Sequence, residues 1–349
     1  MTGGAGFLGS AIALRLKADY PAAHIVALDN LRRRGSELNP ARLKARGVDF
    51  VHADIRSVED IETAGLDLII ECSAEPSALA GRSGDARYLL DTNLGGAINC
   101  LELARRNRAA LLFISTSRVY PFDRINALPF TVSGSRFALD GTGNLPAGIG
   151  RAGLTTDFGL PGRRTLYGAS KLAAELIVQE YADTYNLPAL ILRPGVIAGP
   201  WQMGKVDQGF VALWVARHLA GTPLQYCGYG GQGHQLRDVL HIDDAVDLIL
   251  AGIARLGAFR GEVFNAGGGA ERSISLAELT ELCQAATGRG IAMGSDPTTR
   301  PGDIPWYVTD NAAATTTLSW TPTRSVTAAV ADILSWLGDN PAVMATIFA

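Results

Sequence analysis

The sequence lacks the features of a membrane or secreted protein. Its 349 residues contain no apolar run of about 18 residues or more, and they do not begin with a basic segment that leads into an apolar stretch. A membrane-spanning helix needs the first of these features, and a secretory signal needs the second. We therefore predict a cytoplasmic protein with no membrane partner.

The sequence also has few cysteines and a small net charge. Four cysteines are widely spaced and form no Cys-x-x-Cys pair, which favours reduced thiols over disulfide bonds. His, Cys and Asp residues nowhere show the spacing of metal ligands, so no metal is implied. A net charge of −3 does not favour nucleic acid as a partner.

A strand is lacking where one is expected. The segment from Thr2 to Ser10 has spaced glycines at Gly3, Gly6 and Gly9 and leads into an apolar helical pattern. Such a loop presents backbone N–H groups and the positive end of a helix to a pyrophosphate. A buried strand normally precedes it, but only two residues do so here. We expect that this first strand is missing or truncated, because the start was assigned at an internal codon or an upstream segment was removed.

The remaining sequence alternates short apolar runs with amphipathic stretches. This alternation predicts an α/β fold, a Rossmann-type doubly wound parallel sheet with a smaller C-terminal α/β substrate domain. We place the first domain at 1–195, with 236–268 interleaved, and the second mainly at 196–349. The expected strands are 24–28, 49–52, 66–71, 110–115, 189–192, 224–226 and 263–265. The expected helices are 96–106, 170–185, 210–219, 243–253 and 276–286.

Residues 121–166 interrupt this alternation. They are rich in Gly, Pro, Ser and Thr and show weak periodicity. A long irregular segment inside a compact domain is usually functional or disordered, and we assign it no motif.

A carboxylate follows the expected strand at 24–28. Asp29 lies where it can accept hydrogen bonds from the adenosine ribose hydroxyls of a dinucleotide. Its charge would repel a 2′-phosphate, so NAD is favoured over NADP. Three consecutive arginines that begin at Arg32 keep NADP as the minority alternative, and Asp54 with Ile55 could contact the adenine.

Three residues form a candidate catalytic set. Tyr167 and Lys171 are four apart at the start of an amphipathic helix, so they share a face. An ammonium group beside a phenol favours the phenolate and lowers a pKa that is about 10 in water. Such a phenol can exchange a proton with a sugar hydroxyl near neutral pH, and Thr116 can hydrogen-bond the same hydroxyl.

Together these motifs resemble the extended short-chain dehydrogenases/reductases, in the nucleotide-sugar epimerase/dehydratase branch. The matching segments run nearly from end to end. They are TGGAGFLGS at the start, Asp29-Asn30-Leu31, Asp54-Ile55, TNLGGA at 92–97, STSRVY at 115–120, YGASK at 167–171, Arg193-Pro194, Gly199-Pro200, RDVLHIDD at 237–244, NAGG at 265–268 and RPGD at 300–303.

The resemblance implies a site divided between an NAD cofactor and a nucleotide-sugar substrate. The cofactor would contact Gly3, Gly6, Phe7, Leu8, Asp29, Asn30, Arg32, Asp54, Ile55, Ser73, Ala74, Asn93, Tyr167 and Lys171. The substrate would contact Arg118, Gln208, Arg237 and Arg300, since guanidinium groups match phosphate oxygens.

The residues after Thr116 indicate which reaction to expect. Similar dehydratases carry an Asp-Glu pair there and similar decarboxylases usually a Glu, but this chain has Ser117 and Arg118. Elimination is therefore disfavoured, and a redox-neutral epimerisation is favoured. Arg118, the segment DQGF at 207–210 and GGQGHQLRDVLH at 230–241 are most similar to the CDP-paratose (CDP-tyvelose) 2-epimerases. The segment that begins at Glu71 departs from the usual His-x-Ala pattern, so the sugar and the epimerised carbon stay open.

Several alternatives also stay open. One alternative is a UDP-glucose 4-epimerase-like enzyme, and another is a net dehydrogenase or reductase. A catalytically silent Rossmann-like binding protein is an alternative from another class, which the short first strand supports. The resemblance further implies a homodimer in which the helices at 96–106 and 170–185 pair with their copies.

Overall fold

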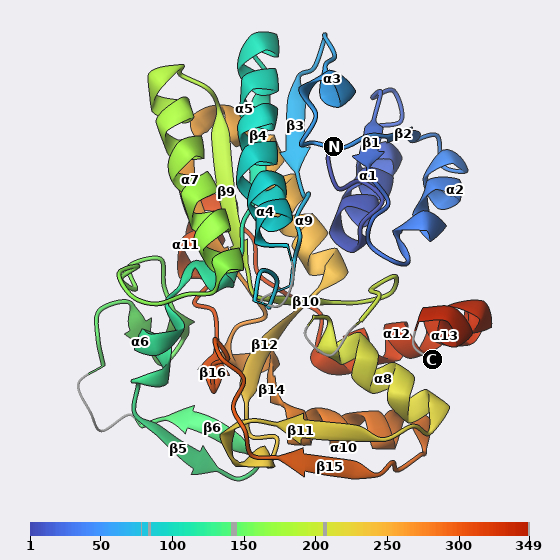
Figure 1. The fold of residues 1–349 in the computed structure, drawn as a ribbon, viewed down its shortest axis with the longest axis vertical. Coiled ribbons are helices and arrows are strands. Elements are labelled where there is room, and N and C mark those ends of the chain that lie inside the picture. Colours follow the sequence, from blue (N-terminus) through green and yellow to red (C-terminus); the bar gives the residue numbers. More distant parts are fainter. Residues whose placement is uncertain (78, 83–84, 141–144, 205–207, 348–349) are drawn as a thin grey trace.

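The fold is described from a computed structural model of residues 1–347, without residues 78, 83–84, 141–144 and 205–207. Its upper part in Figure 1 is a sheet with helices on both faces, and its lower part holds smaller sheets. No described helix has the length and apolarity to cross a membrane.

The upper part is built on parallel strands, as the sequence predicts. The strands are β1 (Val26–Asp29), β2 (Asp49–His52), β3 (Leu68–Glu71), β4 (Ala110–Ile114), β9 (Ala189–Pro194) and β13 (Arg260–Ala266). β1 pairs with β2, and β3, β4, β9 and β13 pair in that order. β13 therefore returns from the second half of the chain to the sheet of the first half.

Met1 and Thr2 occupy the strand position between β1 and β3. Thr2 forms parallel bridges to Leu28 and Glu71. The Thr2 N–H donates to the Ile70 carbonyl at 3.1 Å, and the Leu28 N–H donates to the Met1 carbonyl at 2.8 Å. The expected first strand is thus present in shortened form, and it joins the two halves into one sheet.

The α-ammonium group of Met1 is buried in this sheet. It donates a hydrogen bond to the Val26 carbonyl at 2.7 Å. Burial lowers the pKa of this group from its ordinary value of 8.0, because a charge is poorly solvated there. The join between the two halves of the sheet therefore carries an electrostatic cost.

Helices cover both faces of the sheet (Figure 1). One face carries α1 (Phe7–Asp19), α9 (Ile242–Ala254) and α11 (Ala312–Leu318), and the other carries α5 (Gly96–Asn107) and α7 (Leu166–Thr184). Buried Ile12 and Leu248 belong to the first core, and buried Leu101 and Val178 to the second. Such double coverage explains why the strands between them are almost wholly apolar. Shorter helices lie at α2 (Asn39–Lys44), α3 (Val58–Ile61) and α4 (Ala86–Leu90).

The lower part combines small sheets with a separate apolar core. Its strands are β10 (Val196–Ala198), β11 (Leu224–Cys227), β12 (Leu236–His241), β14 (Ser273–Ser275), β15 (Met293–Asp296) and β16 (Trp306–Tyr307). Its helices are α8 (Phe210–Ala220), α10 (Leu276–Thr287), α12 (Val326–Asp339) and α13 (Pro341–Ile347). Residues of α8, α10 and α12 form one buried cluster.

The irregular segment 121–166 contains more structure than its composition indicates. Its elements are α6 (Phe122–Asn126), β5 (Phe130–Ser133), β6 (Arg136–Leu139), β7 (Ile149–Gly150) and β8 (Gly153–Leu154). Buried Ile125, Leu154 and Phe158 of this segment share a core with Ile304 and Tyr307 near the C-terminal end of the chain. Arg136 forms an ion pair with Glu278 of α10 at 2.5 Å, which fastens the β5–β6 hairpin to the lower part.

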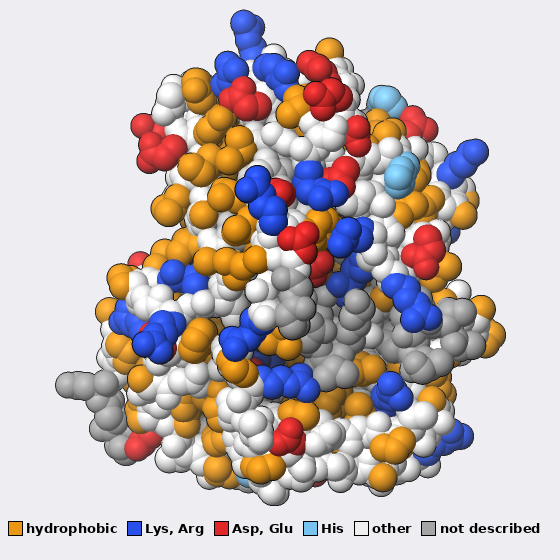
Figure 2. All heavy atoms as spheres, viewed as in Figure 1, with side chains coloured by type: hydrophobic (Ala, Val, Ile, Leu, Met, Phe, Trp, Pro, Cys, Tyr) orange, Lys and Arg blue, Asp and Glu red, His pale blue; other side chains and the backbone are white. Residues whose placement is uncertain are grey.

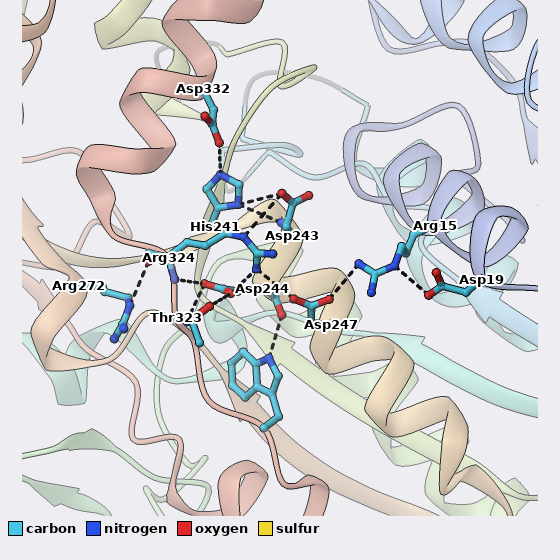
Figure 3. A network of polar contacts seen from close by, with 11 residues as sticks. Arg15, Asp19, His241, Asp243, Asp244, Asp247, Arg272, Thr323, Arg324 and Asp332 are labelled. Atoms are coloured by element: carbon cyan, nitrogen blue, oxygen red, sulfur yellow. Dashed lines mark hydrogen bonds and ion pairs between the residues drawn. The ribbon is translucent and has the colours of Figure 1, made fainter.

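A polar network ties the C-terminal segment to the helices under the sheet (Figure 3). The buried Asp244 carboxylate of α9 accepts hydrogen bonds from Thr323 and Arg324. Asp247, one turn later, bridges Arg324 and Arg15 of α1 at 3.0 Å each. The network therefore fixes the approach to α12 relative to both α9 and α1.

We predict that an engineered extension of about four β-branched apolar residues ahead of Met1 stabilises the protein. The extension would move the ammonium charge out of the sheet and pair with β1 and β3. The free energy of unfolding should rise by on the order of 2 kcal/mol in chemical denaturation.

A glycine–serine extension of equal length is the matched control, since it moves the charge but adds little apolar area. The folded chain binds its N-terminal proton less tightly than the unfolded chain does, so the native chain should gain stability as the pH rises toward 8.0. Either extension should remove this pH dependence of the stability. An apolar extension that leaves stability unchanged or lowers it would contradict the prediction.

Candidate active site

A single large cavity of about 1240 Å³ lies where the sheet meets the lower part. It opens at the carboxyl ends of β1, β3 and β4, where open α/β sheets bind ligands. Residues from both parts of the chain line it. Figure 2 shows Lys and Arg side chains around the middle of the same face as Figure 1.

The glycine loop forms one wall of this cavity and fits a pyrophosphate. Gly3 has a φ of +60°, and a Cβ there would lie 2.7 Å from the backbone of Cys72. A Cβ at Gly9 would lie 2.2 Å from the Gly3 carbonyl oxygen. Only glycine permits this close packing. Within the described chain no side chain caps α1, so its first N–H groups at Phe7 and Leu8 can donate to phosphate oxygens.

Asp29 reaches the cavity from the end of β1. Its carboxylate accepts hydrogen bonds from the N–H groups of Ala5 at 3.1 Å and Leu31 at 2.9 Å. Burial raises the pKa of this carboxyl, and these hydrogen bonds oppose the increase. Asp29 thus links the glycine loop to the next turn and still lines the cavity.

The three arginines from Arg32 to Arg34 also line the cavity, and two of them contact other residues as well. The Arg32 guanidinium group lies 3.8 Å from the centroid of the Tyr88 ring. Arg33 donates to the Met203 carbonyl at 3.1 Å and to the Gln208 side chain. These contacts reach from the turn after β1 to a segment of the lower part.

The other expected cofactor residues divide into two groups. The large cavity is lined by the glycine loop and Asp29, and also by Asn30, Ile55, Ser73 and Ala74. Asp54 and Asn93 are not among the described residues that line it. Asp54 accepts hydrogen bonds from Asn30 at 2.9 Å and from Arg56, which holds the pKa of its carboxyl well below the ordinary value.

Asn93 lies behind the cavity wall. It belongs to a π-helical turn, Asp91–Gly95, between α4 and α5. Its side chain accepts a hydrogen bond from the Glu75 N–H at 2.8 Å and donates to the Ser170 hydroxyl at 3.1 Å. Asn93 therefore fixes the loop after β3 to the helix that carries Tyr167.

The catalytic candidates meet at the same cavity, which all three of them line. Tyr167 and Lys171 lie on the first turns of α7, whose N-cap Thr165 accepts a hydrogen bond from the Gly168 N–H. A Cβ on Gly168 would lie 2.1 Å from the Arg118 carbonyl oxygen, so glycine lets α7 approach the turn after β4. Thr116 is in that turn. All three side chains are nearly buried.

A carboxylate that was not among the expected site residues contacts Lys171. Glu71 at the end of β3 lies 3.4 Å from the Lys171 ammonium group, and both side chains are almost wholly buried. Like Asp29, Glu71 is a carboxylate at the end of an apolar strand. The same rule applied to β3 would have selected Glu71 as well.

Arginines gather at the other end of the cavity, where Arg118, Arg237 and Arg300 line the wall. Gln208 also lines the cavity, where it accepts a hydrogen bond from Arg33. Arg118 donates to the Gly302 carbonyl at 3.4 Å. Arg237 pairs with Asp303 at 3.1 Å, and burial lowers the pKa of Arg237 to about 10. Arg300 lies 3.4 Å from the Cys227 sulfur. This end is suited to an anionic ligand. The described residues contain no cluster of three or more metal-ligating side chains.

Comparisons with known proteins agree with this geometry. The profile of the "NAD dependent epimerase/dehydratase family" matches residues 1–267. CDP-paratose 2-epimerase from Salmonella typhi is 28% identical over 96% of this chain and 98% of its own length. dTDP-glucose 4,6-dehydratase from Streptomyces niveus is 28% identical over 98% of this chain and 93% of its own length.

A solved structure supports the fold. UDP-glucuronic acid 4-epimerase from Bacillus cereus, crystallised with UDP-glucuronic acid and NAD, matches with a TM-score of 0.74 and 23% identity. The match covers 97% of this chain and 98% of that one. The profile match extends from the glycine loop through the catalytic candidates and β13. The chain therefore belongs to the NAD-dependent epimerase/dehydratase family.

Proposed function

We propose that the protein is an NAD-dependent epimerase that acts on a nucleoside-diphosphate sugar. One observation carries the proposal: Tyr167, Lys171 and Thr116 line the same cavity as the glycine loop at one end and three arginines at the other. The loop and Asp29 would hold the two halves of the cofactor. Arg118, Arg237 and Arg300 would hold the diphosphate of the substrate.

The residues of the chain would manage the protons of the reaction. NAD, when bound, supplies a hydride acceptor and donor. Tyr167 would accept the proton from a sugar hydroxyl and later return it, and the Thr116 hydroxyl would hydrogen-bond the same oxygen. An ammonium group near a phenol favours the phenolate, so Lys171 would support this role of Tyr167. Water exclusion by the nearly buried site strengthens that effect.

Epimerisation is favoured over dehydration by the residues around Thr116. The turn after β4 contains Ser117 and Arg118 and no carboxylate. Glu75 is the one carboxylate at the described cavity wall near the end of β3, and its side chain accepts a hydrogen bond from the Ser77 N–H at 3.4 Å. A dehydrated product would identify Glu75 as an acid–base group, and it would replace the epimerase proposal.

For the substrate we propose a CDP-sugar that is inverted at carbon 2, as the name of the Salmonella typhi relative implies for that protein. A UDP-sugar inverted at carbon 4 is the second candidate. It is favoured by a putative UDP-glucose 4-epimerase from Methanocaldococcus jannaschii, which is 27% identical over 97% of this chain and 98% of its own length. Free thiols at all four cysteines accord with a reducing, cytoplasmic setting.

We predict that the NAD-loaded protein converts one member of a panel of CDP-, UDP-, GDP- and dTDP-sugars to its epimer without net NADH formation. Tyr167→Phe should lower the rate by a factor of roughly 10² or more, because it removes the acid–base group. Nuclear magnetic resonance of the sugars in deuterated water identifies the carbon, and absorbance follows NADH.

Full activity in Tyr167→Phe would refute this mechanism. No product from any sugar, with no bound NAD, would favour a silent binding protein, and steady NADH formation would favour a net dehydrogenase.

We predict that Asp29→Asn weakens NAD binding about tenfold, which corresponds to about 1.4 kcal/mol. The variant should also move the preference between cofactors toward NADP, since the charge that repels a 2′-phosphate is gone. Titrations of both cofactors by calorimetry measure the two effects. Asp49→Asn, on the exposed neighbouring strand β2, is the matched control. An equal loss for both cofactors would point to damage to the loop instead.

For the assembly we propose a homodimer in which α5 and α7 pair with their copies. α7 and its C-terminal end expose two large apolar side chains, Leu176 with 55% and Tyr185 with 50% relative accessibility. Tyr181 of α7 donates a hydrogen bond to Glu102 of α5 at 2.8 Å, which holds the two helices together. Leu176 thus gives the outer face of α7 an exposed apolar side chain that a second copy would bury.

We predict that Leu176→Arg converts the dimer into a monomer in analytical ultracentrifugation. Burial of an unpaired charge at the centre of an interface costs several kcal/mol. Val132→Arg, at an equally exposed position on the β5–β6 hairpin, should leave the dimer intact. A dimer that survives Leu176→Arg would place the interface elsewhere.

A further inference from the structure

Lys171 contacts a buried carboxylate that lies outside the described cavity lining. The side chains of Lys171 and Glu71 are 1% and 2% exposed, and their charged atoms are 3.4 Å apart. Lys171 lines the cavity, whereas Glu71 is absent from the described lining. The ammonium group therefore lies between the cavity and the carboxylate.

The surroundings of this pair offer little other charge. The Lys171 ammonium group lies 4.1 Å from the centroid of the Phe113 ring. The thiols of Cys72 and Cys100 are close enough to Glu71 that its charge raises the pKa of both. Burial raises the pKa of both thiols, so they stay protonated, and the Met1 ammonium group acts on them. Among the described residues, Glu71 is thus the only carboxylate in contact with Lys171.

Two opposing effects act on the buried carboxyl of Glu71. Burial raises its pKa, because a charge is poorly solvated there, and Lys171 opposes that increase. The contact with Lys171 therefore stabilises the ionised form of Glu71.

We propose that Glu71 is a positioning residue of the active site, because its buried carboxylate holds the Lys171 ammonium group at the cavity wall that Tyr167 also lines. The proposal rests on the proposed function for the role of Tyr167 as the acid–base group. It adds a cause for the position of Lys171. Without the carboxylate, the ammonium group would lose the contact that holds it at this wall.

Thr2 extends the same arrangement toward the cofactor loop. It forms a parallel bridge to Glu71, and its next residue is Gly3. The backbone that seats Glu71 therefore also places the first glycine of the loop. The catalytic lysine and the phosphate loop share one support in the middle of the sheet.

The test measures ionisation of Tyr167 directly in the NAD-bound protein, with no sugar present. The ultraviolet absorption of tyrosinate is followed against pH, and the same titration of Tyr167→Phe is subtracted. Glu71→Gln should raise the midpoint of the Tyr167 signal by roughly one pH unit or more, because the positive charge of Lys171 is no longer held at the cavity wall. An unchanged or lower midpoint would overturn the proposal.

A double-mutant cycle separates this role from a structural one. Lys171→Met should raise the midpoint by itself, and the addition of Glu71→Gln to Lys171→Met should change it no further. The double variant removes both charges, so it also folds where a single buried charge would not be tolerated. A further shift in the double variant would show that Glu71 acts on Tyr167 without Lys171, which contradicts the proposal.

Asp244→Asn is the matched control for loss of a buried carboxylate. Asp244 is 1% exposed and lies on α9 outside the described cavity lining. This variant should lower the melting temperature but leave the Tyr167 midpoint unchanged. Because no sugar is used, a failure of the epimerase proposal shows in the substrate panel, and a failure of the Glu71 proposal shows in this titration.

Discussion

The hydrogen bonds of Met1 and Thr2 to β1 and β3 position everything at the upper end of the cavity. They connect the two groups of paired strands, so the turn after β1 and the turn after β3 have fixed places relative to each other. The Thr2 carbonyl accepts the Cys72 N–H at 3.3 Å. Gly3, directly after Thr2, therefore packs against the backbone of Cys72 without room for a side chain. The shape of the phosphate loop follows from this one short strand.

The cavity is electrostatically divided in a way that suits a redox-neutral reaction on an anionic substrate. Carboxylates stand at the ends of β1 and β3, one beside the expected ribose and one behind Lys171. Arginines stand at the far end, where Arg118 also acts on the charge of Arg237. Mutual repulsion of such cations falls when a diphosphate binds between them, so the unfavourable charge of the free site favours the ligand.

Much of this arrangement was predictable from local sequence. The strand at 49–52 and the helix at 96–106 are confirmed with ends that differ by one residue at most. Their period and their apolar runs are properties of neighbouring residues. The contacts that complete the site are not local. Glu71 and Lys171 are 100 residues apart, and Arg33 and Gln208 are 175 apart. The periodicity of a local segment does not reveal contacts between residues so far apart in the sequence. The β5–β6 hairpin was missed for a related reason, since Arg136 at the start of β6 is held by Glu278 of a distant helix.

The short first strand does not by itself favour a silent protein. A lost central strand would leave β1 and β3 with unpaired backbone groups. Met1 and Thr2 instead hydrogen-bond to β1 at Val26 and Leu28 and to β3 at Ile70. Thr2 also forms a bridge to Glu71, so the same pairing supports the place of the glycine loop and of Glu71.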